Sequence, residues 1–305
     1  MEEGEREMTL ESFSGELKKT PLTSGFAEQI NILRDRYGDE YVHLAETVLA
    51  LFEDMGFDAV KAARKYIYDY LQQLDYFLKH GNYGHADYST VKKQIYDDKD
   101  TMLKTYMPGL LLSYAYTTIL YEKNHLFLNV FLPQIHGKYK GVEVGFGEGF
   151  YLWELLDNKK EIEMAGYDIS PYALEFARSF LSKAGIESDR YALDRGNVFE
   201  GIPVDSNSMD FAVFAEVIEH IPNPEIGLHE VVRMLRVGGI LYLTTVIDSN
   251  HMDHISNFES PEVVERMLAE EGMTIIDKNI YHMKDDFPDS ADISVGLAFV
   301  AKKDG

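Results

Sequence analysis

The sequence of 305 residues contains no cysteine. Disulfide bonds, thiolate metal sites and cysteine nucleophiles are therefore excluded. Positive charge is also scarce, because 29 Lys and Arg residues stand against 52 Asp and Glu residues, which gives a formal net charge of -23 and a pI near 4.7. A nucleic-acid backbone or an anionic membrane surface is bound by clustered Lys and Arg, so neither is expected as a partner.

Long apolar runs are missing as well. The most apolar stretch, residues 107–121, is short for a bilayer and is interrupted by Ser113, Thr117 and Thr118, so it predicts a buried helix. The first seven residues are acidic and polar, whereas a signal peptide begins basic and then turns apolar. No export is expected, and the cytoplasm is the default location. With 45% hydrophobic residues, the chain is expected to be a soluble globular protein.

Residues 1–136 predict an all-helical domain. The first 22 residues have no sustained period and predict a flexible tail or a short leading helix. From residue 24 to residue 80, apolar side chains recur at three- and four-residue steps, and two further helical segments, 91–106 and 109–132, are divided by Pro108. This domain is expected to act as a cap that selects a substrate, as a dimerisation module, or as both.

Tyrosine is concentrated in the first part of the chain, because fourteen of the twenty tyrosines precede Gly141. Two interpretations are open. The rings form core and interface contacts for the most part, or their hydroxyl groups line a pocket and orient a substrate. The tyrosines in question are Tyr66, Tyr68, Tyr70, Tyr76, Tyr106, Tyr114, Tyr116 and Tyr121.

Residues 137–305 alternate strand and helix patterns, which predicts an α/β domain with a mostly parallel sheet covered on both faces. The first strand ends in a turn with glycine at alternate positions, at Gly145, Gly147 and Gly149. The further expected strands are 163–168, 191–195, 209–215, 240–246, 274–283 and 293–301, and the expected helices are 171–184, 224–235 and 261–271.

The glycine turn points to a ligand that approaches the backbone closely. Its Gly-x-Gly-x-Gly spacing differs from the Gly-x-Gly-x-x-Gly of dinucleotide-binding turns, which favours a nucleoside ligand without phosphates and opposes a nicotinamide-dependent oxidoreductase. Glu143 lies within the strand before the turn. A carboxylate in a buried strand needs a cationic or N–H partner, and the ammonium of an amino-acid ligand would supply one.

Over residues 139–303, the sequence resembles the class I S-adenosylmethionine-dependent methyltransferases, particularly the small-molecule group related to ubiquinone and menaquinone methyltransferases. The resemblance rests on several ordered motifs. They are Val-Glu-Val-Gly-Phe-Gly-Glu-Gly at 142–149, Asp168 within Tyr-Asp-Ile-Ser, Glu-Val-Ile-Glu-His-Ile-Pro-Asn-Pro at 216–224, and Leu-Arg-Val-Gly-Gly at 235–239.

This resemblance implies a Rossmann-like seven-stranded methyltransferase sheet whose last strand is antiparallel, with S-adenosyl-L-methionine bound across the carboxyl ends of the strands. Asp168 would accept both ribose hydroxyls, and Glu143 would reach the ammonium group. Asn197 stands where many relatives carry an Asp that takes the adenine amino group. The implied cofactor-binding residues are Glu143, Gly145, Phe146, Gly147, Gly149, Tyr167, Asp168, Ile169, Asn197, Val198 and Glu216.

Four side chains are candidates for catalysis. His220 would act as a general base or orient the substrate, and Glu216 would contact the cofactor or the substrate. His251 and His254 are second candidates for the base, and with Asp248 and Asp253 nearby they could begin a metal site. The resembled family usually needs no metal, so none is expected.

The predicted function is methyl transfer from S-adenosylmethionine to an O, N or C atom of a small molecule, in specialised or cofactor metabolism. Methyl transfer from a sulfonium is a direct displacement, so positioning and desolvation carry most of the catalysis. Two alternatives stay open: a non-catalytic S-adenosylmethionine-binding regulatory or partner subunit, and methylation of a peptide. A homodimer is a further possibility.

Overall fold

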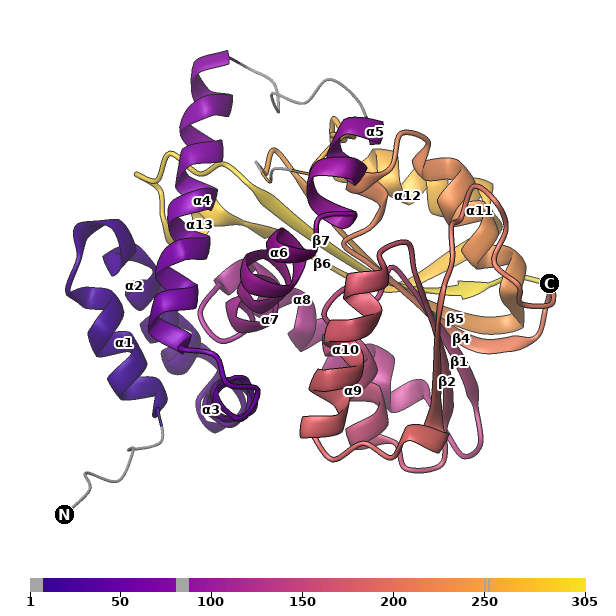
Figure 1. Ribbon diagram of the computed structural model, residues 1–305. Helices are drawn as coiled ribbons and strands as arrows, with labels where there is room; N and C mark the ends of the chain where they lie inside the picture. Colours follow the sequence, from indigo (N-terminus) through magenta and orange to yellow (C-terminus); the bar gives the residue numbers. More distant parts are fainter. Residues whose placement is uncertain (1–7, 81–87, 250, 252) are drawn as a thin grey trace.

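The fold centres on a seven-stranded sheet with strand order β3-β2-β1-β4-β5-β7-β6. It is seen in a computed structural model that describes residues 8–80, 88–249, 251 and 253–305 (Figure 1). The strands are β1 (Lys140–Val144), β2 (Glu163–Asp168), β3 (Tyr191–Arg195), β4 (Met209–Ala215), β5 (Leu235–Ile247), β6 (Met273–His282) and β7 (Val295–Lys303).

The first five strands run parallel, and β7 lies antiparallel between β5 and β6. The predicted fold class is therefore confirmed. The sequence also predicted the bounds of β2, β3 and β4 correctly. It placed the start of β5 at Ile240, five residues late, and assigned Leu235 to the preceding helix. Leu235 instead pairs with Met209, and the register shifts before Ile240 pairs with Phe211.

Helices cover both faces of the sheet. On one face lie α9 (Phe150–Asn158) and α10 (Pro171–Lys183), and on the other lie α11 (Pro224–Met234) and α12 (Pro261–Glu270). Alternate residues of β4 point to opposite sides, so that Val213 joins the first core and Phe214 joins the second. Ser170 is the N-cap of α10, as predicted, since its hydroxyl accepts a hydrogen bond from the Tyr172 N–H.

The helical region consists of short and long helices that precede β1. They are α1 (Leu10–Lys18), α2 (Pro21–Tyr37), α3 (Asp39–Asp54), α4 (Ala59–His80), α5 (Tyr88–Val91), η1 (Lys92–Tyr96), α6 (Lys99–Thr101), η2 (Met102–Tyr106), α7 (Met107–Ser113), α8 (Thr118–Leu126), η3 (Phe127–Phe131) and η4 (Leu132–Gln134). Short helices also follow β1, namely η5 (Ser188–Arg190), η6 (Ile218–His220) and α13 (Met283–Asp286).

The predicted leading helix is present as α1, while residues 1–7 of the predicted tail and most of the predicted 81–89 connection lie outside the described residues. The predicted division at Pro108 was wrong. η2 runs directly into α7, and Pro108 stands in the first turn of α7, where its missing N–H is tolerated. The break comes later, at Thr117, whose extended backbone precedes α8.

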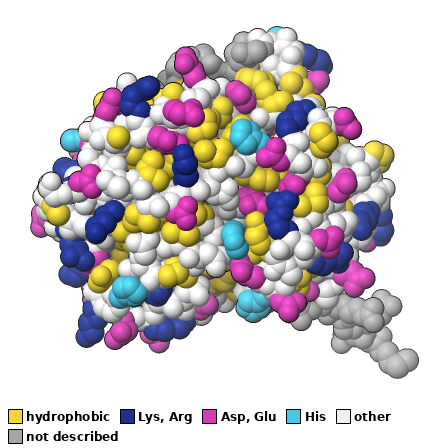
Figure 2. Space-filling model, turned by 180° about the vertical axis from the view of Figure 1, so that it is seen from behind, with side chains coloured by type: hydrophobic (Ala, Val, Ile, Leu, Met, Phe, Trp, Pro, Cys, Tyr) yellow, Lys and Arg dark blue, Asp and Glu magenta, His cyan; other side chains and the backbone are white. Residues whose placement is uncertain are grey.

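The helical region packs directly on the seven-stranded sheet. α8 lies against β6 and β7, α3 contacts α10, and one apolar core cluster runs from Leu10 in α1 to Val300 in β7 (Figure 1). Whether residues 1–136 form a separate domain stays a prediction. On the face shown in Figure 2, acidic and basic side chains are interspersed. Among the described residues, no helix is long and apolar enough to cross a membrane.

Candidate functional site

A large cavity opens at the carboxyl ends of the parallel strands, where doubly wound sheets bind their ligands. Its floor includes Val144, Asp168, Ala215 and Val246, which lie at or near the ends of β1, β2, β4 and β5. Its volume of about 230 Å³ is far more than a few water molecules need. The walls come from the glycine turn on one side and from the tyrosines of the helical region on the other.

The glycine turn adopts the backbone that its sequence predicts. Gly145, Gly147 and Gly149 all have positive φ, at 72°, 52° and 89°, which L-residues rarely adopt. A Cβ on Gly145 would lie 2.4 Å from a methyl group of Val217, whereas a Cβ on Gly147 would meet nothing within 4 Å. Gly147 is therefore bare toward the cavity. Gly149 is not among the lining residues and instead begins α9, packed against Ala177.

Asp168 is tied to the glycine turn. One carboxylate oxygen accepts the Gly147 N–H at 3.0 Å, and the other accepts the Ser170 N–H at 2.8 Å. Burial raises the pKa of Asp168 to about 6, although those two N–H groups lower it. A carboxylate has about four acceptor positions, so the two oxygens retain capacity for two ribose hydroxyls.

Glu143 and Glu148 place two more carboxyl groups at the same end of the cavity. Glu143 is 2% exposed, and its Oε2 has no hydrogen-bond partner among the described residues. Burial, reinforced by Glu148 and Asp168, raises its pKa well above the usual value. Burial also raises the pKa of Glu148 to about 7. A ligand ammonium would supply the partner that Glu143 lacks.

Five further residues that were predicted to bind the cofactor line the cavity, namely Phe146, Tyr167, Ile169, Asn197 and Val198. The amide of Asn197 is already engaged. Its oxygen accepts the Phe199 N–H at 3.0 Å, and its nitrogen donates to Glu200 at 2.9 Å. This arrangement fixes the loop after β3, and one lone pair of the amide oxygen is left for a ligand.

Glu216 directly follows β4 and has a strained backbone conformation, with φ of 52°. Its Oε1 accepts hydrogen bonds from Thr244 at 2.7 Å and from the ammonium of Lys123 at 2.6 Å. Lys123, on α8, is 2% exposed. Both charged residues line the cavity, and strain held by such contacts is typical of functional positions. The sequence analysis predicted Glu216 but not Lys123.

His220 lies next to Asp253. Its Nδ1 lies 3.2 Å from the backbone oxygen and 3.3 Å from the carboxylate of Asp253. Asp253 also accepts the hydroxyls of Tyr96, at 2.9 Å, and of Tyr106. Burial lowers the pKa of His220, but Asp253 and Glu219 outweigh it and raise that pKa overall.

The two histidines after β5 reach the same cavity. His251 lies against the rings of Tyr66 and Tyr70, with centroid distances of 5.8 Å and 5.5 Å. His254 lies 4.8 Å from His220 by ring centroids. Burial lowers the pKa of His251, and it lowers that of His254 further. The structure thus brings together all four residues that were predicted as catalytic candidates.

Several tyrosines of the helical region face this cavity. Five of the eight considered in the sequence analysis line it: Tyr66, Tyr70, Tyr106, Tyr114 and Tyr116. Tyr68 and Tyr76 are exposed, and Tyr121 packs against other rings. Tyr106, Tyr114 and Tyr116 belong to the buried core as well as to the cavity wall, so the two interpretations overlap, and a role of the hydroxyl groups in orienting a substrate stays a prediction.

The residues missed by sequence reasoning are Lys123, Glu148 and Tyr96. For Lys123 a signal was present, since Glu122, Lys123 and Asn124 form a polar run within an apolar helix and all three are buried. A consecutive polar run at buried helical positions indicates specific partners. Tyr96 carried no such signal, because its partner Asp253 is 157 residues away.

Comparison with known proteins agrees with this geometry. Residues 142–243 match a methyltransferase domain family. The chain is 31% identical over 112 residues to 2-methyl-6-phytyl-1,4-hydroquinone methyltransferase 1, chloroplastic, of Oryza sativa subsp. japonica, covering 35% of this chain and 31% of that protein. It is 29% identical over 107 residues to ubiquinone biosynthesis O-methyltransferase of Azoarcus sp. (strain BH72), covering 35% and 44%.

The matched segments span less than half the length of these curated relatives. Among solved structures, an S-adenosylmethionine-dependent methyltransferase from Methanosarcina mazei aligns with 16% identity and a TM-score of 0.48, covering 58% of this chain and 97% of that one.

The sheet order, with β7 antiparallel, and the cavity over the glycine turn define a Rossmann-like nucleoside-binding domain. The family match identifies residues 142–243 as similar to a methyltransferase domain, and S-adenosylmethionine is the nucleoside ligand that this similarity supports. The residues present fit this cofactor. Gly147 leaves the turn bare, Asp168 offers acceptors for the ribose, and Glu143 is a buried carboxyl group in need of a donor.

Proposed function

We propose that the protein is an S-adenosylmethionine-dependent methyltransferase whose acceptor is a small hydroxylated aromatic molecule. The observation that carries this proposal is a single cavity shared by the two halves of the site. One end holds the glycine turn and Asp168. The other end is lined by tyrosines and by the histidine cluster of His220, His251 and His254. A methyl donor and an acceptor would therefore meet inside this cavity.

At the donor end, different residues of the chain would bind different groups of the cofactor. Glu143 would accept a hydrogen bond from the ligand ammonium, and Asp168 would accept hydrogen bonds from the ribose hydroxyls. S-adenosylmethionine supplies an electrophilic methyl group when bound. The buried walls exclude water around it, and such exclusion together with alignment of the acceptor accounts for most of the acceleration in displacements of this kind.

The acceptor end favours an aromatic ring with hydroxyl groups. Tyr106, Tyr114 and Tyr116 supply aromatic walls, and Lys123 with Glu216 supplies a charged pair that can hydrogen-bond a substrate oxygen. The curated relatives are named for a hydroquinone and for ubiquinone biosynthesis, which supports the same substrate class. The helical region would then select the acceptor. A cytoplasmic location belongs to the same proposal, and a homodimer stays a prediction.

A non-catalytic S-adenosylmethionine-binding subunit would be favoured by a crevice filled by the tyrosine-rich helices. The cavity between those helices and the glycine turn instead holds about 230 Å³, with the Lys123–Glu216 pair and His220 on its wall. This open space supports catalysis over the regulatory alternative.

Two measurements test the proposal. Calorimetry of the full chain with S-adenosylmethionine and S-adenosylhomocysteine should show saturable binding of both. Incubation with methyl-labelled S-adenosylmethionine and a panel of phenols, catechols and hydroquinones should then transfer label to at least one member. Failure of both ligands to bind at millimolar concentration would contradict cofactor binding. Binding without transfer to any member would contradict the assigned acceptor class.

A further inference from the structure

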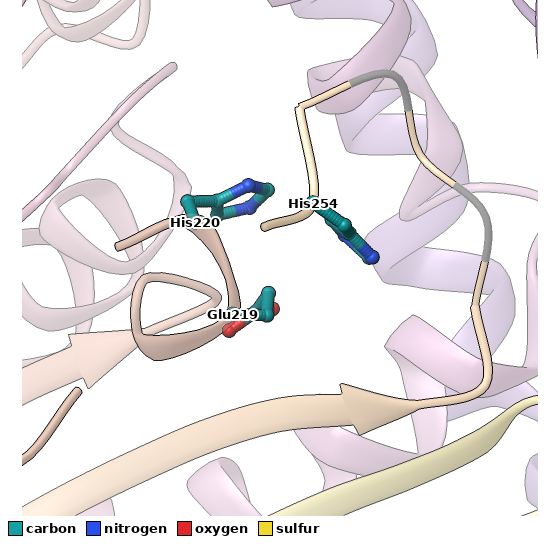
Figure 3. Close-up of side chains that lie close together, drawn as sticks. All are labelled: Glu219, His220 and His254. Atoms are coloured by element: carbon teal, nitrogen blue, oxygen red, sulfur yellow. The ribbon is translucent and has the colours of Figure 1, made fainter. Parts of the chain in front are cut away.

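We propose that Glu219, His220 and His254 form a binding site for a first-row transition-metal dication at the acceptor end of the cavity. One potential ligand atom from each residue lies within 4.8 Å of the other two. Glu219 and His220 belong to η6 after β4, and His254 belongs to the loop after β5. Figure 3 shows the two imidazole rings close together, with Glu219 below them.

Glu219 provides an observation that itself calls for a ligand. The residue is fully buried, at 0% exposure. Its Oε2 accepts the Thr245 hydroxyl at 2.8 Å, but its Oε1 has no hydrogen-bond partner among the described residues. An unsatisfied buried carboxylate oxygen is unfavourable unless a proton or a cation reaches it. A cation between Glu219 and the two rings would remove this penalty.

The two rings are held as metal-binding histidines are held. Nδ1 of His254 lies 2.8 Å from the backbone oxygen of Ser249, and Nδ1 of His220 lies 3.2 Å from the backbone oxygen of Asp253. When Nδ1 carries the proton and donates to a carbonyl, the ring lone pair is on Nε2. A second contact that fixes the tautomer and the ring orientation in this way is typical of histidine ligands.

The turn that carries Glu219 and His220 and the loop that carries His254 are also joined by backbone hydrogen bonds. The backbone oxygen of Glu219 accepts the N–H groups of Ile255, at 2.8 Å, and Ser256, at 2.9 Å. The loop that carries His254 is therefore fastened to the turn that carries Glu219 and His220. Asp248, a ligand candidate from sequence, is not part of this group, and its carboxylate accepts a hydrogen bond from the side-chain amide of Asn257. A rigid support of this kind favours a preorganised ligand set.

The donor set selects the class of metal. Two imidazoles and one carboxylate suit Zn²⁺, Co²⁺, Mn²⁺ or Fe²⁺, whereas Mg²⁺ and Ca²⁺ prefer oxygen ligands alone. Three protein ligands leave an open position, as catalytic sites do. His220 and His254 line the cavity while Glu219 lies behind them, so the open position faces the cavity. The expectation of no metal, drawn from the resembled family, is replaced by this proposal.

The role of the open position rests on the proposed function. A phenolic oxygen of the acceptor would bind the cation there, and its O–H bond would break with release of the proton to solvent. The oxygen keeps the electron pair and becomes the nucleophile that methyl transfer needs. A dication lowers the pKa of a bound hydroxyl group, so no separate strong base is required.

The binding test uses the full chain after removal of metal by a chelator. Calorimetry with Zn²⁺ and with Co²⁺ should show one equivalent bound, and the Co²⁺-loaded protein should show visible ligand-field bands. His254→Gln and Glu219→Gln should each weaken binding at least 100-fold. The matched control is His229→Gln, because His229 is an exposed histidine of α11 that pairs with Glu271 and does not line the cavity. This variant should bind metal as the native chain does.

Absence of saturable binding in the native chain would overturn the site. So would equal affinity in the native chain and in both cluster variants. Thermal melting and S-adenosylhomocysteine binding by each metal-free variant show that it is folded, and a metal-binding loss in a folded variant supports the site. If His254→Gln folds but Glu219→Gln does not, the His254→Gln result decides.

Failure of the metal site and failure of the proposed function are distinguishable. S-adenosylhomocysteine binding by the metal-free native chain reports on the methyltransferase function, while Co²⁺ binding reports on the cluster alone. Nitrocatechol added to the Co²⁺-loaded protein probes the open position. A shift of the ligand-field bands supports a phenolic oxygen at that position, and unchanged bands at saturating nitrocatechol would overturn that part of the proposal.

Discussion

The two ends of the cavity are built by different means. The donor end, with the glycine turn and Asp168, comes from one segment of 28 residues, 141–168. Its shape depends mainly on the main chain, through the positive φ angles of the glycines and the hydrogen bond from the Gly147 N–H to Asp168. At the acceptor end, the contacts join residues far apart in sequence. Lys123 meets Glu216 across 93 positions, and Tyr96 meets Asp253 across 157.

This difference shows that the local sequence determines the geometry of the donor end but not that of the acceptor end. A positive-φ glycine and a carboxylate at a strand end are set by neighbouring residues and by the sheet, so they tolerate little change. The acceptor end depends on side chains that several elements bring together. It can change its specificity by substitution without disturbing the sheet, as loops and added elements on a rigid scaffold commonly do.

Removing the ribose acceptor should have the largest effect. Asp168→Ala is expected to weaken S-adenosylhomocysteine binding by about 1000-fold, since two hydrogen bonds to a charged group are lost at about 2 kcal/mol each. Calorimetry measures this loss. Asp194→Ala, at an exposed position of β3, is the control and should bind normally. Equal affinities in the two variants would mean that the donor end is not where the cofactor binds.

The glycine turn should respond next. Gly145→Ala is expected to lower the free energy of unfolding by about 3 kcal/mol, because a Cβ adds a clash with Val217 to the cost of positive φ. Gly185→Ala has the same backbone problem, with φ of 74°, but meets open space. Urea unfolding should therefore show a loss of only about 1 kcal/mol there. Similar losses in both variants would refute the clash.

At the acceptor end, Lys123→Met should lower the free energy of unfolding by about 2 kcal/mol. It leaves Glu216 without its ammonium partner at a partly buried position, 28% exposed. Adding Glu216→Gln should recover part of the loss, and a double-mutant cycle measures the coupling. Additive effects of the two substitutions would show that the buried pair has no energetic role.

The smallest effect is a pH dependence that separates the two ends. Burial raises the pKa of Asp168 to about 6. Below that pH the carboxyl group is protonated and must lose its proton to accept two hydroxyls, so cofactor affinity should fall about tenfold from pH 7 to pH 5. Glu143, whose pKa burial also raises, acts in the same direction. Affinity that rises toward acid pH would contradict both assignments.

Asp168→Asn is the matched control for this pH profile. It keeps the shape of the side chain but cannot ionise, so its weaker affinity should depend less on pH than that of the native chain. The remaining slope would report on Glu143 and Glu148, which share the cavity wall. An unchanged slope in Asp168→Asn would assign the titration to those two residues alone.

Prediction from sequence succeeded where the signals are local. The strands β2, β3 and β4, the N-cap at Ser170 and the positive-φ glycines follow from short patterns whose physical causes lie within a few residues. The start of β5 was missed because a register shift beside Met209 lets an irregular segment join the sheet.

The acceptor end was only partly predictable, since its contacts depend on the fold. His220, His251 and His254 were recognised as polar residues near strand ends, but their grouping with Asp253 and Tyr96 needed the packing of η1 against the loop after β5. Lys123 lies in a polar run that is visible in the sequence, but its partner Glu216, on a different element, is known only from the structure. Residue type and spacing alone carry no information on such distant partners.

A crystal structure of the full chain with S-adenosylhomocysteine tests the central claim, that one cavity holds the cofactor over the glycine turn and the acceptor beside the histidine cluster. It should show the ligand ammonium on Glu143, both ribose hydroxyls on Asp168, and the sulfur pointing toward the space between Lys123 and His220. A ligand bound elsewhere, or one whose sulfur points away from that space, would contradict the account.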